Sequence, residues 1–259
     1  MSDAEAMTSE LASRVVRSGV DRRSAAVLQP LFDAMAPSYR CTEWASFGMM
    51  RALRRVALER LRLTPGMSVA DLMCGPGVIW EDLSRAIGES GRILAIDFSE
   101  RMTTMARHRA SAVDSRNVTV LRENVLRTSL APQSVDAIFC SFGLKLFDET
   151  GVRQLAAEVH RILKPGGSFV FAEAVVPRST AYRALFLGYL RVVLPLLFSV
   201  LTSETRAFAT LVDYVSSGQD VECFAAALEL RGAHVEVERR WGGCARLLYG
   251  RISSSSVDG

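Results

Sequence analysis

The sequence predicts an α/β protein with a doubly wound, mostly parallel, seven-stranded sheet. Short apolar runs alternate with segments of helical period between Ser68 and Ala174, which is typical of β-α-β units. A glycine-containing turn, Gly75-Pro76-Gly77, follows the first apolar run, as expected at the start of such a fold. Two closely spaced apolar runs near the end of the chain predict one antiparallel strand at an edge of the sheet.

Composition limits the class of protein. The chain has 259 residues, 49% of them hydrophobic, which suits one α/β domain with added segments. Its net charge of +3 comes from scattered residues with no basic stripe, so no nucleic-acid partner is expected. Five widely spaced cysteines form no C-x-x-C pair, so we predict neither a metal site nor a redox dithiol. A reducing, cytoplasmic setting fits this cysteine usage.

The chain divides into five expected parts. They are an N-terminal helical segment (1–63), a ligand-binding core (64–178), a helical lid (179–218), a C-terminal helix with a strand hairpin (219–252) and a disordered tail (253–259). Apolar runs predict strands over 68–73, 92–97, 117–121, 135–141, 168–174, 234–238 and 245–250. Helical periodicity predicts helices over 49–63, 78–87, 99–112, 150–163 and 221–231, and a turn over Lys164–Gly167.

One apolar segment, Ala184–Leu201, raises the question of a membrane span. Arg191 and Pro195 interrupt it, whereas a spanning helix needs about 20 mostly apolar residues. The N-terminal residues also lack the apolar stretch of a signal peptide. We therefore predict no transmembrane span, and peripheral membrane contact and a homodimer stay open.

The turn after the first strand indicates a nucleoside site. Ligands of doubly wound sheets bind beyond the carboxyl ends of the strands, where Gly75 and Gly77 let the backbone approach closely. Trp80 stands where a dinucleotide fingerprint has its third glycine, and no P-loop lysine follows, so no diphosphate is expected. Asp97 ends the second strand about 20 residues on, where an acid grips ribose hydroxyls. Ser99 is the more natural helix N-cap.

These residues resemble a known family. Asp71-Leu-Met-Cys-Gly-Pro-Gly77 is similar to motif I of class I S-adenosylmethionine-dependent methyltransferases, and Leu94–Asp97 is similar to their second strand. The resemblance implies S-adenosylmethionine as cofactor. It also implies cofactor contacts from Asp71, Cys74, Gly75, Gly77, Asp97, Phe98, Met102, Asn124, Val125 and Ser141. The family usually has aspartate at the position of Asn124, but an amide oxygen still accepts from the adenine amine.

Longer segments resemble the ubiquinone/menaquinone biosynthesis C-methyltransferases, from about Val27 onward. The similar segments are Leu31–Tyr39, Ser46–Gly48, Ser141–Lys145, Arg161–Gly167 and Gly242–Gly250. Two departures concern the acceptor half. Lys145 and Leu146 replace an Arg-Asn pair that the family uses to deprotonate the quinol, and Glu173-Ala-Val-Val-Pro177 replaces Glu-Phe-Ser-Lys-Pro. The resemblance therefore implies the cofactor, and a quinone acceptor is not asserted from it.

Catalytic candidates are expected at the cofactor edge of the sheet. Topology places there Tyr39, Glu43, Trp44, Lys145, Asp148, Glu173, Tyr182 and Tyr189. We favour Lys145 and Glu173, with Tyr39, as the catalytic residues, and a solvated loop lysine is the competing interpretation of Lys145. The apolar lid predicts a hydrophobic small-molecule acceptor that is aromatic, polyketide-like or prenylated.

The sequence thus predicts an S-adenosylmethionine-dependent methyltransferase, with carbon as the preferred target. O-methylation of a natural product stays open, and so does a cyclase that keeps the cofactor as a scaffold. A non-catalytic binding protein is a further alternative, against which the glycine loop and Asp97 argue.

Overall fold

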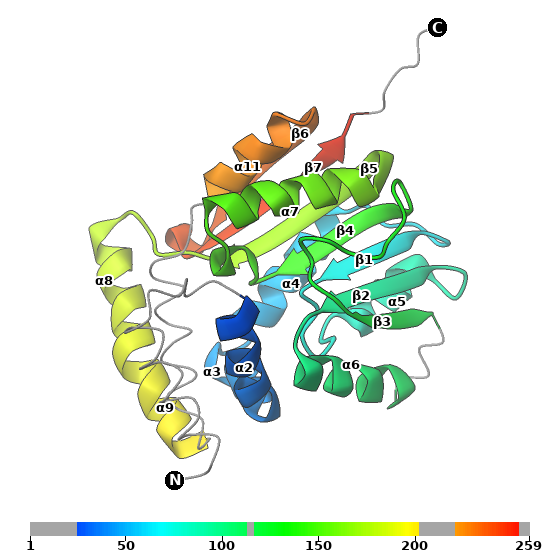
Figure 1. Cartoon of the computed structure of the whole chain (residues 1–259). Helices are drawn as coiled ribbons and strands as arrows, with labels where there is room; N and C mark the ends of the chain where they lie inside the picture. The colour runs from blue at the N-terminus through cyan, green and yellow to red at the C-terminus, as the bar shows by residue number, and fades with distance from the viewer. Residues whose placement is uncertain (1–24, 113–116, 202–220, 254–259) are drawn as a thin grey trace, which may run out of the picture.

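The computed structural model describes residues 25–112, 117–201 and 221–253, and it has the predicted α/β architecture (Figure 1). Seven strands form one sheet in the order β3-β2-β1-β4-β5-β7-β6. The strands are β1 Ser68–Leu72, β2 Arg92–Asp97, β3 Val118–Arg122, β4 Val135–Ser141, β5 Leu163–Ala174, β6 Ala233–Arg240 and β7 Ala245–Ile252. Neighbours from β3 to β5 pair in parallel, which brings the carboxyl ends of these strands to one edge.

The antiparallel strand is β7, and it does not lie at the edge as predicted. It pairs with both β5 and β6, so β6 is the outer strand. The physical reason lies in the side chains. Leu247 and Leu248 of β7 are fully buried on opposite faces of the sheet, whereas β6 exposes His234, Glu236 and other polar residues. A polar strand is suited to an open edge.

The predicted turn at Lys164–Gly167 is also wrong, because β5 begins at Leu163 and runs through it. The pairing with β4 shifts register between Val135 and Ala137. The glycines therefore lie in an irregular part of the strand and do not end it. Gly166 takes a positive φ of 75°, which glycine adopts without steric cost.

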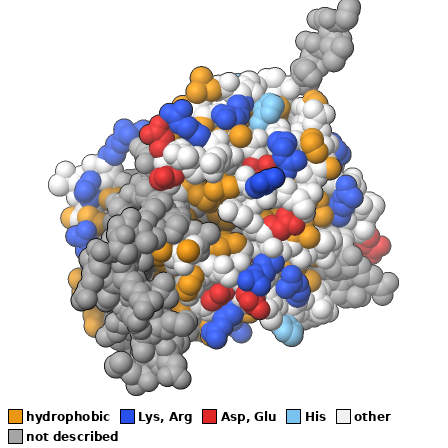
Figure 2. Space-filling model, in the orientation of Figure 1, with side chains coloured by type: hydrophobic (Ala, Val, Ile, Leu, Met, Phe, Trp, Pro, Cys, Tyr) orange, Lys and Arg blue, Asp and Glu red, His pale blue; other side chains and the backbone are white. Residues whose placement is uncertain are grey.

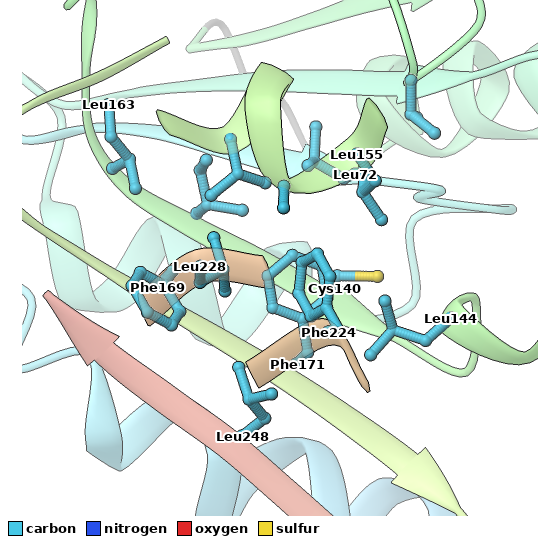
Figure 3. Packing of buried hydrophobic residues seen from close by; sticks show 14 of the residues in the cluster. Leu72, Cys140, Leu144, Leu155, Leu163, Phe169, Phe171, Phe224, Leu228 and Leu248 are labelled. Carbon is cyan, nitrogen blue, oxygen red and sulfur yellow. The ribbon is translucent and has the colours of Figure 1, made fainter. Parts of the chain in front are cut away.

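Helices cover both faces of the sheet and bury alternate strand residues on each. α7 (Glu149–Ile162) and α11 (Val221–Glu229) pack on one face, against Leu72, Cys140 and Phe171 (Figure 3). α4 (Met49–Arg60), α5 (Trp80–Ile87) and α6 (Glu100–Ala112) cover the other. The alternation follows the two-residue period of strand side chains.

Two groups of helices lie together at one end of the molecule (Figure 1). The first group is α2 (Ala25–Met35), a 3₁₀ turn (Ala36–Ser38) and α3 (Tyr39–Ala45). The second is α8 (Thr180–Gly188), a π-helical turn (Tyr189–Val193) and α9 (Leu194–Leu201). α9 packs on α3, and the Tyr189 hydroxyl donates a hydrogen bond to the Ala45 carbonyl. The rest of the predicted lid and the predicted disordered tail from residue 254 lie outside the described residues.

Candidate functional site

The loop between β1 and α5 packs against the Trp80 side chain. Gly75 and Gly77 have positive φ angles of 53° and 72°, and a Cβ on Gly77 would lie 2.6 Å from the Trp80 ring. The loop therefore requires glycine there because the indole packs against the backbone. The Trp80 Nε1 donates to Asp71 Oδ2 at 2.8 Å, which fixes the end of β1 beneath the loop.

Asp71 is 2% exposed, and burial raises its pKa to about 7, although the indole hydrogen bond and the charge of Arg54 oppose that rise. The ionised form of this carboxyl group is therefore stabilised by the indole hydrogen bond and by the charge of Arg54. One of its oxygens is bound by Trp80, which gives Asp71 a loop-supporting contact that the sequence did not indicate.

Asp97 sits at the end of β2 with its carboxylate turned toward the loop. Oδ2 accepts from the Gly75 backbone N–H and Oδ1 from the Ser99 N–H, both at 2.9 Å. Burial raises the pKa of Asp97 to about 6, against the effect of these hydrogen bonds. Each carboxylate oxygen still has a second lone pair, so the pair can accept two vicinal hydroxyls.

The helix N-cap is Ser99, as predicted. Its Oγ accepts from the Met102 backbone N–H at 3.1 Å, which leaves Asp97 free of that role. The Ser99 hydroxyl in turn donates to Asp33 of α2 at 2.5 Å, which links α2 to the start of α6.

The remaining predicted cofactor residues gather near this edge, because β2 and β3 pair in parallel with Asp97 opposite Arg122. Met102 and Val125 are buried, and Cys74 lies within the loop at 8% exposure. Phe98 makes an edge-to-face contact with Phe32 of α2, with centroids 6.1 Å apart. Asn124 is exposed, and its Oδ1 accepts from the Leu126 N–H at 3.0 Å, which leaves one lone pair for a ligand. The donor and acceptor set fits a nucleoside.

A cavity of about 830 Å³ opens beside the loop and has mainly apolar walls. The two groups of end helices enclose it together with the residues that follow β4 and the end of β5. All three predicted catalytic residues, Tyr39, Lys145 and Glu173, line it. A cavity of this size holds a drug-sized, largely apolar molecule.

Glu173 is the buried acid of this cavity, with 2% exposure. Its Oε1 accepts from the Leu144 backbone N–H at 2.7 Å. Burial raises the pKa of Glu173 to about 7, although this hydrogen bond, a second one from the Gly143 backbone and the charge of Lys145 all lower it. The carboxyl is therefore poised to exchange a proton near neutral pH.

Lys145 lies in a short 3₁₀ turn, Leu144–Leu146, and is 8% exposed. The competing interpretation of a solvated loop lysine is thus wrong, because the turn directs this residue into the cavity wall. Its charge acts on Glu173, so a cation and an acid share one end of an otherwise apolar space.

Arg54 of α4, which the sequence pattern did not single out, is a buried cation with 2% exposure. Its Nε donates to Ser141 Oγ at 3.1 Å and its Nη1 donates to the Glu43 carboxylate. The guanidinium also lies 5.0 Å from the Phe142 ring centroid and is hydrogen-bonded to the Tyr39 side chain. Arg54 therefore joins α3 to the end of β4.

A signal for Arg54 was present in the helical pattern. It follows Met50 by four residues and precedes Ala57 by three, so it falls on the apolar face of α4. An arginine on such a face is seldom buried without partners.

Two other candidates have structural or surface positions. Asp148 is the N-cap of α7 and accepts from the Gly151 N–H at 2.7 Å. Trp44 is 74% exposed. Within the described part of the chain, no group of three His, Cys, Asp or Glu side chains has metal-site spacing.

Replacing Trp80 with phenylalanine is expected to lower the free energy of unfolding by about 1–3 kcal/mol, because a buried Asp71 oxygen loses its donor. The loss should be larger above pH 7 than below it, since the ionised carboxylate needs the indole most. Urea denaturation above and below pH 7 measures this loss of stability. A double-mutant cycle with Asp71→Ala, which removes the acceptor, supplies the control, and equal losses in both backgrounds would show that the hydrogen bond is not the cause.

The family model described as the ubiE/COQ5 methyltransferase family matches residues 20–248. A demethylmenaquinone methyltransferase of Lactococcus lactis is 26% identical over 218 residues, covering 83% of this chain and 86% of the relative. One from Desulfitobacterium hafniense is 28% identical over 200 residues, covering 76% and 77%.

Solved structures share the fold. A SAM-dependent methyltransferase from Aquifex aeolicus matches with a TM-score of 0.54 and 21% identity, over 77% of this chain and 89% of that one. An N-methyltransferase from Haemonchus contortus, in complex with S-adenosylhomocysteine, matches with a TM-score of 0.64 and 14% identity. That match covers 87% of this chain and 60% of the other.

Proposed function

Because the chain belongs to the ubiE/COQ5 methyltransferase family, we propose that it methylates a ring carbon of a lipophilic phenol or quinol. It is an S-adenosylmethionine-dependent enzyme, and that cofactor supplies an electrophilic methyl group on a sulfonium. What we propose beyond the family is that the methyl group goes to carbon and that the acceptor is a lipophilic phenol or quinol. The observation that carries it is Glu173, a buried carboxyl with a pKa near 7 at the polar end of an apolar cavity of about 830 Å³.

The cofactor residues have separate proposed roles. Asp97 accepts the ribose hydroxyls, while Gly75 and Gly77 allow the loop to approach. Met102 would cover the adenine, and Asn124 and Val125 would hold its edge. Ser141, held by Arg54, lies toward the methionine moiety.

Tyr39 supports the proposed alignment of donor and acceptor. It lines the cavity, and its ring lies 3.9 Å from the position of a Cβ on Gly75. One side chain therefore separates the cofactor loop from the acceptor space. Such placement favours an in-line displacement, in which the enzyme mainly aligns the nucleophile and excludes water.

The proton chemistry follows from Glu173 and Lys145. The ionised Glu173 takes the hydroxyl proton of the acceptor, and the Lys145 cation stabilises the resulting phenolate. Negative charge spreads to the ring carbon, which forms the new carbon–carbon bond as the carbon–sulfur bond breaks. The ring proton then moves to the oxygen and restores the aromatic ring, and Glu173 releases its proton to water.

The test uses the purified protein with methyl-labelled cofactor and matched phenols and quinols, with and without a prenyl chain. We expect label on carbon, identified by NMR of the product, and preference for the prenylated acceptors. A methyl ether would contradict carbon as the target. An unlabelled product of unchanged mass would contradict methyl transfer to these acceptors and favour a cyclase. Asp97→Ala is the control for cofactor dependence.

A further inference from the structure

The helix pair α8–α9 is apolar but not buried. Thr180–Leu197 has a mean hydropathy of 1.3, long and apolar enough to cross a membrane, yet only 6% of it is buried in the protein. Leu185, Val192 and Leu196 are 73%, 57% and 64% exposed. A helix that served only as core would cover these side chains, so the exposure requires another explanation.

The exposed apolar side chains lie on segments that also form the wall of the acceptor cavity. Three segments far apart in sequence contribute: the α3–α4 connection, the helices α8–α9 and the β6–β7 turn. We call this set the apolar rim; it consists of Phe47, Met49, Tyr182, Leu185, Val192, Val193, Leu196 and Trp241. Most of its members also line the cavity, so its surface is continuous with the acceptor space.

The charges beside the apolar rim are positive. Arg183 and Arg191, both exposed, are the charged residues of Thr180–Leu197, which has no aspartate or glutamate. At the start of α4, Arg51 is exposed two residues after Met49, while Glu43 is paired with Arg54. Figure 2 shows basic and apolar side chains along the margin of the molecule where α8 lies in Figure 1.

A membrane-spanning arrangement does not fit this helix pair. α9 packs on α3, Tyr189 is hydrogen-bonded to Ala45, and Tyr189 and Leu190 form part of the cavity wall. Withdrawing the helices into a bilayer would open the cavity. An apolar face with arginines beside it is instead typical of a helix that lies in the plane of a membrane surface.

We propose that the apolar rim docks on an anionic phospholipid bilayer and turns the cavity mouth toward the hydrocarbon layer. The rim side chains enter the boundary between headgroups and acyl chains, while Arg183, Arg191 and Arg51 contact lipid phosphates. A lipophilic acceptor then passes from the bilayer into the cavity without crossing water. Exposure and charge are the evidence for this docking surface. Its lipid binding is measured without any acceptor, so the result does not depend on the proposed reaction.

Sedimentation with vesicles tests the proposal. We expect the full chain to bind vesicles of equal parts phosphatidylglycerol and phosphatidylcholine, and to bind pure phosphatidylcholine more weakly. The triple variant Leu185→Glu, Val192→Glu, Leu196→Glu should bind at least about tenfold more weakly. Leu230→Glu is the matched control, because Leu230 is 81% exposed but lies outside the rim, and it should bind like the parent. The double variant Arg183→Gln, Arg191→Gln should lose the preference for phosphatidylglycerol.

Folding and assembly are measured on the same variants. Circular dichroism and cofactor binding should be unchanged in the triple variant, since it alters exposed side chains; the arginine double variant keeps the test decisive if the triple variant does not fold. Parent-like vesicle binding by folded rim variants would overturn the proposal. So would analytical ultracentrifugation that finds a dimer of the parent but a monomer of the triple variant, because a second copy would then cover the rim.

Discussion

Replacing Asp97 with alanine is expected to weaken binding of S-adenosylmethionine by at least about a hundredfold. Hydrogen bonds to a charged group contribute about 1.5–3 kcal/mol each, and Asp97 offers one oxygen to each ribose hydroxyl. Since about 1.4 kcal/mol corresponds to tenfold in affinity, the loss of both bonds gives this magnitude or more. The carboxylate also holds the Gly75 and Ser99 N–H groups, so its loss loosens the loop itself.

Isothermal titration calorimetry of the purified variant measures this loss. Asp136→Ala is the matched control, because Asp136 lies at the opposite edge of the sheet, where it is hydrogen-bonded to Lys164 and to the Ser68 N–H. It removes a partnered aspartate without touching the loop and should leave affinity unchanged. Parent-like affinity in a folded Asp97→Ala variant would contradict the ribose assignment.

The placement of the predicted cofactor residues at one edge of the sheet could be predicted because their pattern is local in sequence. The glycines, Asp97 and Ser99 occupy the ends of adjacent strands and the start of a helix, and strand periodicity places those ends together. N-cap preference predicted that Ser99 caps the helix after β2, and the hydrogen bond from the Met102 N–H to Ser99 Oγ confirmed it.

The cavity and its polar residues could be predicted only in part. Tyr39, Lys145 and Glu173 were expected at the correct edge, and all three line the cavity. The burial of Lys145 and the network around Arg54 depend on how α3 and α4 pack on the end of β4, which no single segment encodes. The prediction that the antiparallel strand lies at the edge was wrong for a related reason. Which strand of the β6–β7 hairpin lies inside the sheet depends on which of them the sheet buries.

Proton uptake by Glu173 has a thermodynamic consequence. Burial raises its pKa in the folded state from the usual 4.5 to about 7, so the folded protein binds a proton that the unfolded chain releases. The resulting contribution to stability is present below about pH 4.5 and is lost as the pH rises toward 7. Glutamine at this position cannot titrate, so Glu173→Gln should flatten that part of the stability profile.

The substitution Glu173→Gln is expected to lower kcat by about 10²–10⁴, the usual range for loss of a general base. Glutamine keeps the shape and can still accept from the Leu144 N–H, but it cannot take a proton. The activity of the parent should rise with pH through about 7, as Glu173 ionises, and the residual activity of the variant should lose that dependence. Affinity for S-adenosylmethionine should be unchanged, because Glu173 lies in the acceptor cavity.

Initial rates with labelled cofactor across pH distinguish this role from a structural one. Glu236→Gln, on the outer strand β6, is the control and should keep the parent rate and pH profile. If Glu173→Gln folds, binds cofactor and turns over at the parent rate, Glu173 is not the base. A lower rate with the parent pH profile would also contradict the assignment, because the titrating group would then be another residue.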